Sequence, residues 1–129
     1  MKVVDTTFLI DYYRERDAIE QYLDAHDEET IAASTITFGE LAVGEIMARS
    51  ETKREILADL GWLDIRAFTT EHAYDTAAIE ADLRDRGEYR ATSANDIEIG
   101  GTARALGVPI VTRNVEDFER FDGVVVETY

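Results

Sequence analysis

Short apolar segments alternate along the chain with longer segments in which apolar residues recur at helical spacing. The short segments have the length and composition of strands, and they comprise residues 2–4, 30–33, 64–68, 109–111 and 124–127. The longer segments are typical of helices that bury one face, and they comprise residues 7–13, 18–25, 37–49, 52–60, 71–86, 94–106 and 115–121. The polar segment 87–93 predicts a loop, and Gly107 is expected to end the helix before it.

This alternation predicts the fold class. Strands separated by helices form a parallel sheet that is covered by helices on both faces. With right-handed crossovers, we expect an α/β chain folded as a three-layer α/β/α sandwich with a short, mainly parallel central sheet. Because no linker, repeat or low-complexity segment interrupts the pattern, we expect residues 1–129 to form a single domain.

Four carboxylates fall where such a sheet collects ligands, beyond the carboxyl ends of its strands. Asp5 and Asp117 follow strands closely, Glu40 follows its strand by a few residues, and Asp96 begins the helix that leads back to the strand 109–111. Each acid alone also has a local explanation as a helix cap, as in the capping box that Glu40 forms with Thr37. Taken together, the four are expected to converge at one edge.

Convergent carboxylates need a neutralising partner. Two of them ~4 Å apart cost about 4 kcal/mol at an effective dielectric constant of 20. Protons or helix N-termini supply part of the compensation, and a hard divalent cation supplies more. Because the chain has no cysteine, an all-oxygen site favours Mg²⁺ or Mn²⁺. The joint pattern therefore predicts a metal site.

The charge balance changes this picture only in part. With 13 basic and 28 acidic residues the net charge is −15, which argues against a generally basic surface for nucleic acid. However, only Lys2 and Lys53 are lysines, and arginine suits bidentate phosphate contacts. Many acids with few lysines are typical of proteins from salt-loving organisms, where a Debye length of roughly 3 Å at molar salt screens repulsion of RNA. The net charge thus indicates a halophilic habitat more than a partner.

Other classes of protein are excluded by simple features. Disulfide and thiolate chemistry need cysteine, which is absent. No apolar segment approaches the ~20 residues that span a membrane, and residues 1–5 lack the apolar core of a signal peptide. We therefore expect a cytoplasmic protein.

Four segments, in order and at matching spacing, resemble the PIN domain of VapC toxins. They are residues 3–7 (VVDTT), 34–41 (STITFGEL), 94–103 (ANDIEIGGTA) and 111–118 (VTRNVEDF). Residue by residue, the resemblance implies that the metal-binding and catalytic acids are Asp5, Glu40 and Asp96, with Asp117 as the more variable fourth. The sequence departs from the family at Gly100 and Gly101, where members usually carry alanine.

The resemblance also implies supporting residues. Thr6 or Thr7, together with Thr112 and Asn114, match polar positions that hold the carboxylates and water. Arg113 lies beside the same edge as a candidate for binding the substrate phosphate, and an ion pair with Glu116 is its alternative role.

The activity implied is that of an endoribonuclease that uses Mg²⁺ or Mn²⁺ to activate water against RNA phosphodiesters. The resemblance further implies a homodimer and a small cognate antitoxin, whose C-terminal tail packs in the groove near the helix 37–49 and blocks the acids. A PIN nuclease of RNA maturation and a catalytically silent PIN-like interaction domain remain as alternatives. A receiver-type signalling domain is disfavoured, because no Asp ends the third strand and no lysine follows Lys53.

Three arginines flank the polar loop before Asp96, at positions 84, 86 and 90. A solvated helix face is the simpler interpretation, and contact with RNA or a partner is the alternative. Tyr89 is a candidate for stacking on an RNA base, because single-stranded RNA is recognised through aromatic side chains.

Overall fold

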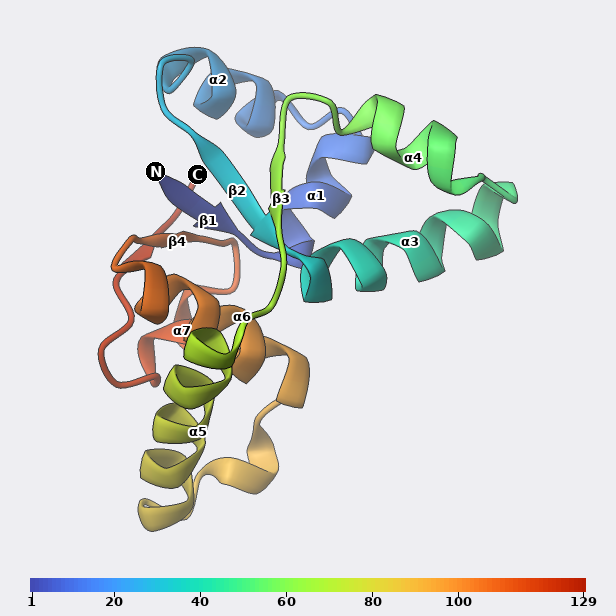
Figure 1. The fold of residues 1–129 in the computed structure, drawn as a ribbon. Helices are drawn as coiled ribbons and strands as arrows, with labels where there is room; N and C mark the ends of the chain where they lie inside the picture. The colour runs from blue at the N-terminus through green and yellow to red at the C-terminus, as the bar shows by residue number, and fades with distance from the viewer.

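The computed structural model describes residues 1–129 and contains a five-stranded sheet with the order β3-β2-β1-β4-β5 (Figure 1). All neighbouring strands are parallel. The strands are β1 (Lys2–Val4), β2 (Ile31–Ser34), β3 (Asp64–Arg66), β4 (Ile110–Val111) and β5 (Val126–Glu127). The helices are α1 (Thr6–Tyr13), α2 (Asp17–Ala25), α3 (Thr35–Arg49), α4 (Lys53–Asp59), α5 (Thr70–Asp85), α6 (Ala94–Leu106) and α7 (Val115–Glu119), with the short 3-10 helix η1 (Tyr89–Ala91). The predicted α/β/α sandwich is confirmed.

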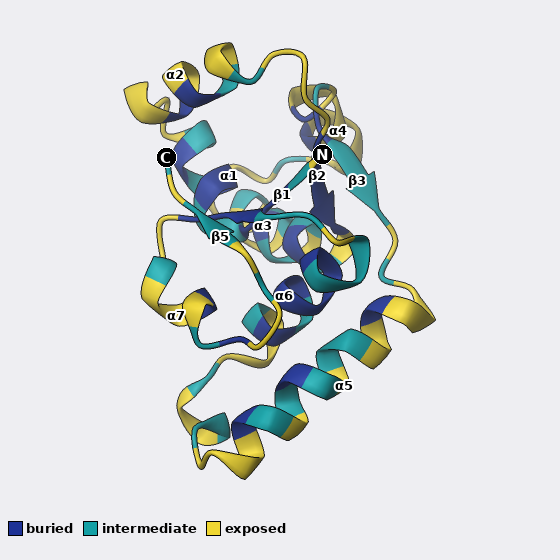
Figure 2. Cartoon of the chain, turned by 90° about the vertical axis from the view of Figure 1, so that its left-hand side faces the viewer, coloured by how far each residue is buried: buried dark blue, intermediate teal, exposed yellow.

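Helices cover both faces of the sheet, because successive strand residues point to opposite sides. One core packs beneath α1, α2 and α4, and the other beneath α5, α6 and α7. The strand residues divide by alternation, with Val4, Ala33 and Val111 in the first core and Val3, Ala32 and Ile110 in the second. Figure 2 shows the buried strands between the two helical layers.

The closest helix contact is made by α6 against α5, and two glycines make it possible. A Cβ at Gly101 would lie 2.7 Å from the backbone nitrogen of Thr76 in α5. A Cβ at Gly100 would lie 2.7 Å from the ring of Phe121. Both distances are shorter than real Cβ contacts, so this fold needs glycine at both positions.

Some predicted boundaries are wrong. Helix α3 begins at Thr35 rather than at residue 37, because the Ser34 hydroxyl accepts a hydrogen bond from the Ile36 N–H at 3.1 Å and caps the helix. The predicted capping box of Thr37 and Glu40 is therefore wrong, and Thr37 is fully buried. The third strand ends at Arg66 rather than at residue 68.

Other boundaries match closely. Helix α6 has the predicted limits and ends at Gly107, which adopts a left-handed conformation with φ of 67°. The strands at 109–111 and 124–127 shorten to two residues each, and α7 ends at Glu119. None of the helices combines the length and apolar composition that a bilayer crossing requires.

Candidate active site

Asp5 lies at the centre of the sheet edge, where β1 ends and α1 begins. Its backbone N–H donates to the Val111 carbonyl at 3.4 Å, so it lies beside the end of β4. Its carboxylate accepts a hydrogen bond from the Phe8 N–H at 3.1 Å, which caps α1 as the sequence predicts. The residue is only 2% exposed.

Two threonine hydroxyls hold the Asp5 carboxylate in one orientation. Thr112 donates to Oδ2 at 2.6 Å, and Thr7 donates to Oδ1 at 2.8 Å. The Thr112 hydroxyl in turn accepts from the Asn114 N–H at 2.9 Å. Burial raises the pKa of Asp5, whereas the hydrogen bonds from Thr112, Thr7 and the Phe8 N–H lower it. A buried acid with this many donors is built to keep its carboxylate in place.

Glu40 reaches the same edge from α3. The Thr6 hydroxyl donates to its Oε1 at 2.7 Å. Thr6 and Thr7 are adjacent in α1 yet hold different acids. The sequence offered them as alternatives, and in the structure each donates to a carboxylate, Thr6 to that of Glu40 and Thr7 to that of Asp5.

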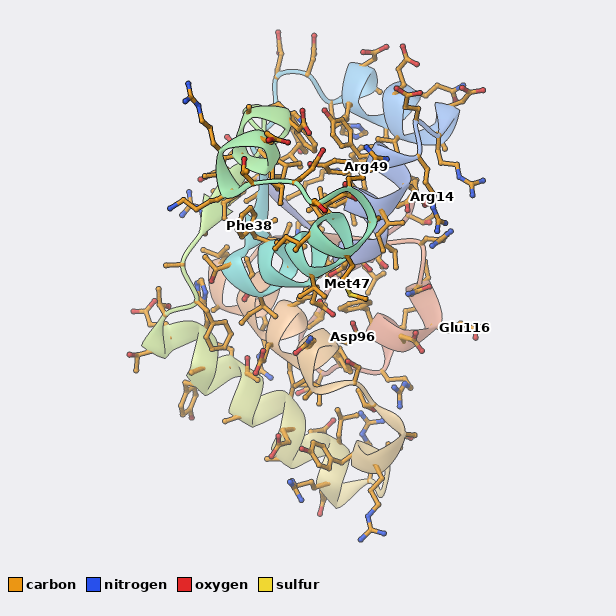
Figure 3. The ribbon with its side chains drawn as sticks, turned by 90° about the vertical axis from the view of Figure 1, so that its right-hand side faces the viewer. Arg14, Phe38, Met47, Arg49, Asp96 and Glu116 are labelled. Atoms are coloured by element: carbon orange, nitrogen blue, oxygen red, sulfur yellow. The ribbon has the colours of Figure 1, made fainter.

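Asp96 lies in the first turn of α6, where it is partly buried (Figure 3). Its pKa is raised to about 6, first by burial and then by the negative charges of Asp5, Glu40 and Asp117. The positive charge of Arg120 acts in the opposite direction. The four acids therefore lie near enough to repel one another through Asp96, which brings together the residues expected at one edge.

Asp117 is exposed on α7, at the rim of the site. It lines a depression of about 400 Å³ together with Arg113, Asn114, Val115 and Glu116. No other side chain donates a hydrogen bond to Asp96 or Asp117, in contrast to Asp5 and Glu40. Threonine hydroxyls thus hold Asp5 and Glu40, whereas the carboxylates of Asp96 and Asp117 have no such donor.

The donor set matches a hard divalent cation in kind. It consists of carboxylates and hydroxyls, and the raised pKa of Asp96 marks an excess of negative charge. In the described conformation, however, no group of three His, Asp or Glu side chains is placed to hold one metal ion together. To hold one ion, the four carboxylates would have to lie closer together than in this conformation, and the charge of the cation would offset the repulsion between them.

Arg113 does not pair with Glu116, so that alternative is wrong. Its Nη1 lies 3.5 Å from Oδ1 of Asp11 in α1, and its side chain is half exposed. Asp11 is 3% exposed and also accepts a hydrogen bond from the Tyr129 hydroxyl at 2.6 Å. Asp11 is not among the predicted site residues, although its position three residues after Phe8 places it on the buried face of α1.

Asn114 acts through its backbone rather than its side chain. It is the N-cap residue of α7, but its side chain makes no capping hydrogen bond. Its backbone N–H donates to the Thr112 hydroxyl, and that hydroxyl donates to the Asp5 carboxylate.

Solved structures share this architecture over nearly the whole chain. VapBC2 from Rickettsia felis, bound to a DNA fragment from its promoter, is similar with a TM-score of 0.86 and 22% identity, covering 99% of this chain and 98% of its own. DNA-bound VapBC from Salmonella typhimurium has a TM-score of 0.84 and 24% identity, with 98% and 96% covered. A toxin–antitoxin complex from Klebsiella pneumoniae has a TM-score of 0.76 and 28% identity, with 97% and 96% covered.

At the level of sequence, a search of curated proteins finds no match. The profile of the PIN domain matches residues 2–124. The match takes in all four segments that carry the resemblance. The chain belongs to the PIN domain family.

Proposed function

We propose that this chain is a divalent-metal-dependent endoribonuclease and the toxin of a toxin–antitoxin pair. One observation carries the proposal: at one edge of the sheet, threonine hydroxyls hold the carboxylates of Asp5 and Glu40, and the negative charges of Asp5, Glu40 and Asp117 add to burial in raising the pKa of Asp96. Four acids from four separate elements have no shared structural purpose at a sheet edge, and a common cation gives them one.

In this proposal Mg²⁺ or Mn²⁺ is held by Asp5 and Asp96, with Glu40 or Asp117 completing the set. Such an ion lowers the pKa of bound water and offsets negative charge on a phosphate. The threonines that hold Asp5 and Glu40 fix the inner half of the site before any ion binds. Asp117 and Asp96 supply the half that adjusts.

The remaining steps belong to residues of the chain. Glu40, oriented by the Thr6 hydroxyl, accepts the proton of the attacking water. Arg113 binds a non-bridging phosphate oxygen of the RNA with the N–H groups of its guanidinium that Asp11 leaves free. Asp11 is buried and hydrogen-bonded to Tyr129, so it holds Arg113 toward the site rather than toward solvent.

The antitoxin is proposed to cover the exposed apolar end of α3. Val43, Ile46 and Met47 are 59%, 54% and 82% exposed, and Met47 lies on the same face of the molecule as Asp96 in Figure 3. Large apolar side chains exposed together are typical of a protein interface. Similar solved structures are described as VapBC or toxin–antitoxin complexes, which supports an antitoxin partner here, and a homodimer is proposed with it.

Cleavage of single-stranded RNA by the purified chain tests the activity. With Mg²⁺ or Mn²⁺ we expect cleavage that EDTA abolishes and that falls by about 100-fold or more in Asp5→Asn. Glu98→Gln is the matched control, because Glu98 is a second acid in the first turns of α6 that is not among the four. Wild-type protein that leaves diverse RNAs intact with either metal would instead indicate a catalytically silent interaction domain.

Growth separates a toxin from a nuclease of RNA maturation. Expression of the wild-type chain should arrest growth, Asp5→Asn should not, and co-expression of a small protein encoded beside it should relieve the arrest. RNA cleavage without any growth arrest would favour RNA maturation.

A further inference from the structure

A small cationic pocket lies outside the acidic site, where α5 leads into η1. It encloses about 200 Å³ and is lined by Arg84, Gly87, Tyr89 and Arg90. No acid lines it, although acids outnumber basic residues by 28 to 13 in the chain. The pocket is therefore a local exception to the negative charge of the protein, and it attracts anions.

Arg84 and Tyr89 form a flat surface in this pocket. The guanidinium carbon of Arg84 lies 3.9 Å from the centre of the Tyr89 ring. The Nε of Arg84 donates to Oε2 of Glu80 at 3.0 Å, which holds the guanidinium over the ring. Stacked arginine and aromatic groups are surfaces on which nucleic acid bases stack without regard to sequence.

Arg90 supplies a charge that no protein carboxylate neutralises. Of the 13 basic residues, nine pair with an acid within 4 Å. The four that do not are Arg14, Lys53, Arg54 and Arg90. Arg90 is exposed and is the only one of these four that lines a pocket with an aromatic ring. A free guanidinium beside a stacking surface matches a phosphate beside a base.

Arg120 connects this pocket with the acids. Its Nη2 donates to the Thr92 hydroxyl at 2.9 Å, so it lies against the segment that follows Arg90. Arg120 is also the C-cap residue of α7, the helix that carries Asp117. Arg120 thus joins the segment that follows the pocket to the helix that carries Asp117, and α5, which leads to the pocket, extends through the lower half of Figure 1.

We infer that single-stranded RNA held at the acidic site runs past Arg120 into this pocket, where a base stacks on the Arg84–Tyr89 pair and Arg90 binds a phosphate. The inference rests on the proposed function for the class of substrate. It adds a binding site that the four acids do not define, because Tyr89 and Arg90 lie in η1 and the pocket that they line contains none of the four acids.

Binding of a fluorescein-labelled single-stranded oligoribonucleotide in EDTA, followed by anisotropy, separates this site from catalysis. Arg90→Ala should weaken binding by about fivefold or more and reduce the slope of log affinity against log salt by about 0.7. Tyr89→Leu should weaken it by at least about fivefold, whereas Tyr89→Phe keeps the ring and should stay within about twofold. Arg54→Ala is the matched control, since Arg54 is equally exposed and unpaired but lies in α4, at the opposite end of Figure 1.

Equal losses in Arg90→Ala and Arg54→Ala would overturn the inference, because only net charge would then matter. It would also be overturned if Arg90→Ala left RNA binding unchanged but weakened binding of a polyglutamate peptide, which would make the pocket a protein site. Unchanged thermal unfolding of each variant excludes misfolding. RNA binding that depends on Arg90 without any cleavage would defeat the proposed function alone, and cleavage with normal binding by the pocket variants would defeat this inference alone.

Discussion

Helices α3 and α6 each carry one acid of the candidate site and each contain two glycines, but they are packed in opposite ways. In α6, six residues are buried, and a Cβ at either glycine would meet α5 or Phe121 at 2.7 Å. In α3, only Thr37 and Leu41 are buried, and a Cβ at Gly39 or Gly44 would meet nothing within 4 Å. The same residue type is therefore required in one helix and replaceable in the other.

This difference assigns the two helices different tasks. Core packing places Asp96, because α6 cannot shift without disturbing α5. Glu40 is placed by a single hydroxyl contact from Thr6, while the outer end of α3 leaves Ile46 and Met47 exposed to a partner. We regard α6 as the support of the site and α3 as its outward-facing surface.

Replacing Gly101 with alanine should give the largest effect on folding. Alanine favours a helix by about 1 kcal/mol over glycine, but the clash with the backbone of Thr76 should outweigh this gain and lower the free energy of unfolding by about 2 kcal/mol. Gly44→Ala is the matched control in α3 and should raise that free energy by about 1 kcal/mol. Urea unfolding measures both, and a rise for Gly101→Ala would refute the packing difference.

In metal-free protein, Asp96→Asn should raise the free energy of unfolding, by less than Gly101→Ala lowers it. The folded state holds the Asp96 proton with a pKa of about 6, above the ordinary 3.8, so this group favours folding below about pH 4 and loses that contribution as the pH rises to about 6. Removing the charge should therefore raise the free energy of unfolding at pH 7 by about 1 kcal/mol, allowing for solvent screening, with little change at pH 4. A loss of stability in Asp96→Asn at pH 7 would contradict the repulsion described here.

Met47→Ser should have the smallest effect on folding, because Met47 is 82% exposed. We expect the free energy of unfolding to change by less than about 0.5 kcal/mol, while antitoxin binding weakens by about tenfold. Tyr74→Ser in α5 is the control, since Tyr74 is 75% exposed on the helix that does not carry the proposed interface. Isothermal titration calorimetry measures the affinity of each variant for the antitoxin. If Met47→Ser binds the antitoxin as tightly as Tyr74→Ser does, α3 is not the interface.

Features with a local cause could be predicted from the sequence. The limits of α6 match because its apolar spacing and its terminal Gly107 act within a few residues. The capping role of Asp5 matches for the same reason. The predicted start of α3 does not match the structure. Ser34 and Thr37 are both good helix caps, and the residue at which β2 ends decides which of them caps α3.

Features that depend on distant segments could not be predicted. The need for glycine at Gly100 and Gly101 arises from the approach of Phe121 and α5. The pairing of Arg113 with Asp11 arises because β4 adjoins β1, which brings the start of the following loop to α1. Convergence of the acids could be expected from strand order, and the threonines that hold them from the resemblance. Which hydroxyl holds which acid, Thr7 and Thr112 with Asp5 and Thr6 with Glu40, depends on how α1, α3 and β4 pack together.

Calorimetric titration with Mn²⁺ is the most direct test of the claim that the four acids serve one cation. The wild-type chain should bind Mn²⁺, Asp5→Asn and Asp96→Asn should each weaken binding by about tenfold or more, and Glu98→Gln should leave it within about twofold. Binding that is as strong in Asp96→Asn as in wild type, or that Glu98→Gln weakens equally, would contradict a shared site.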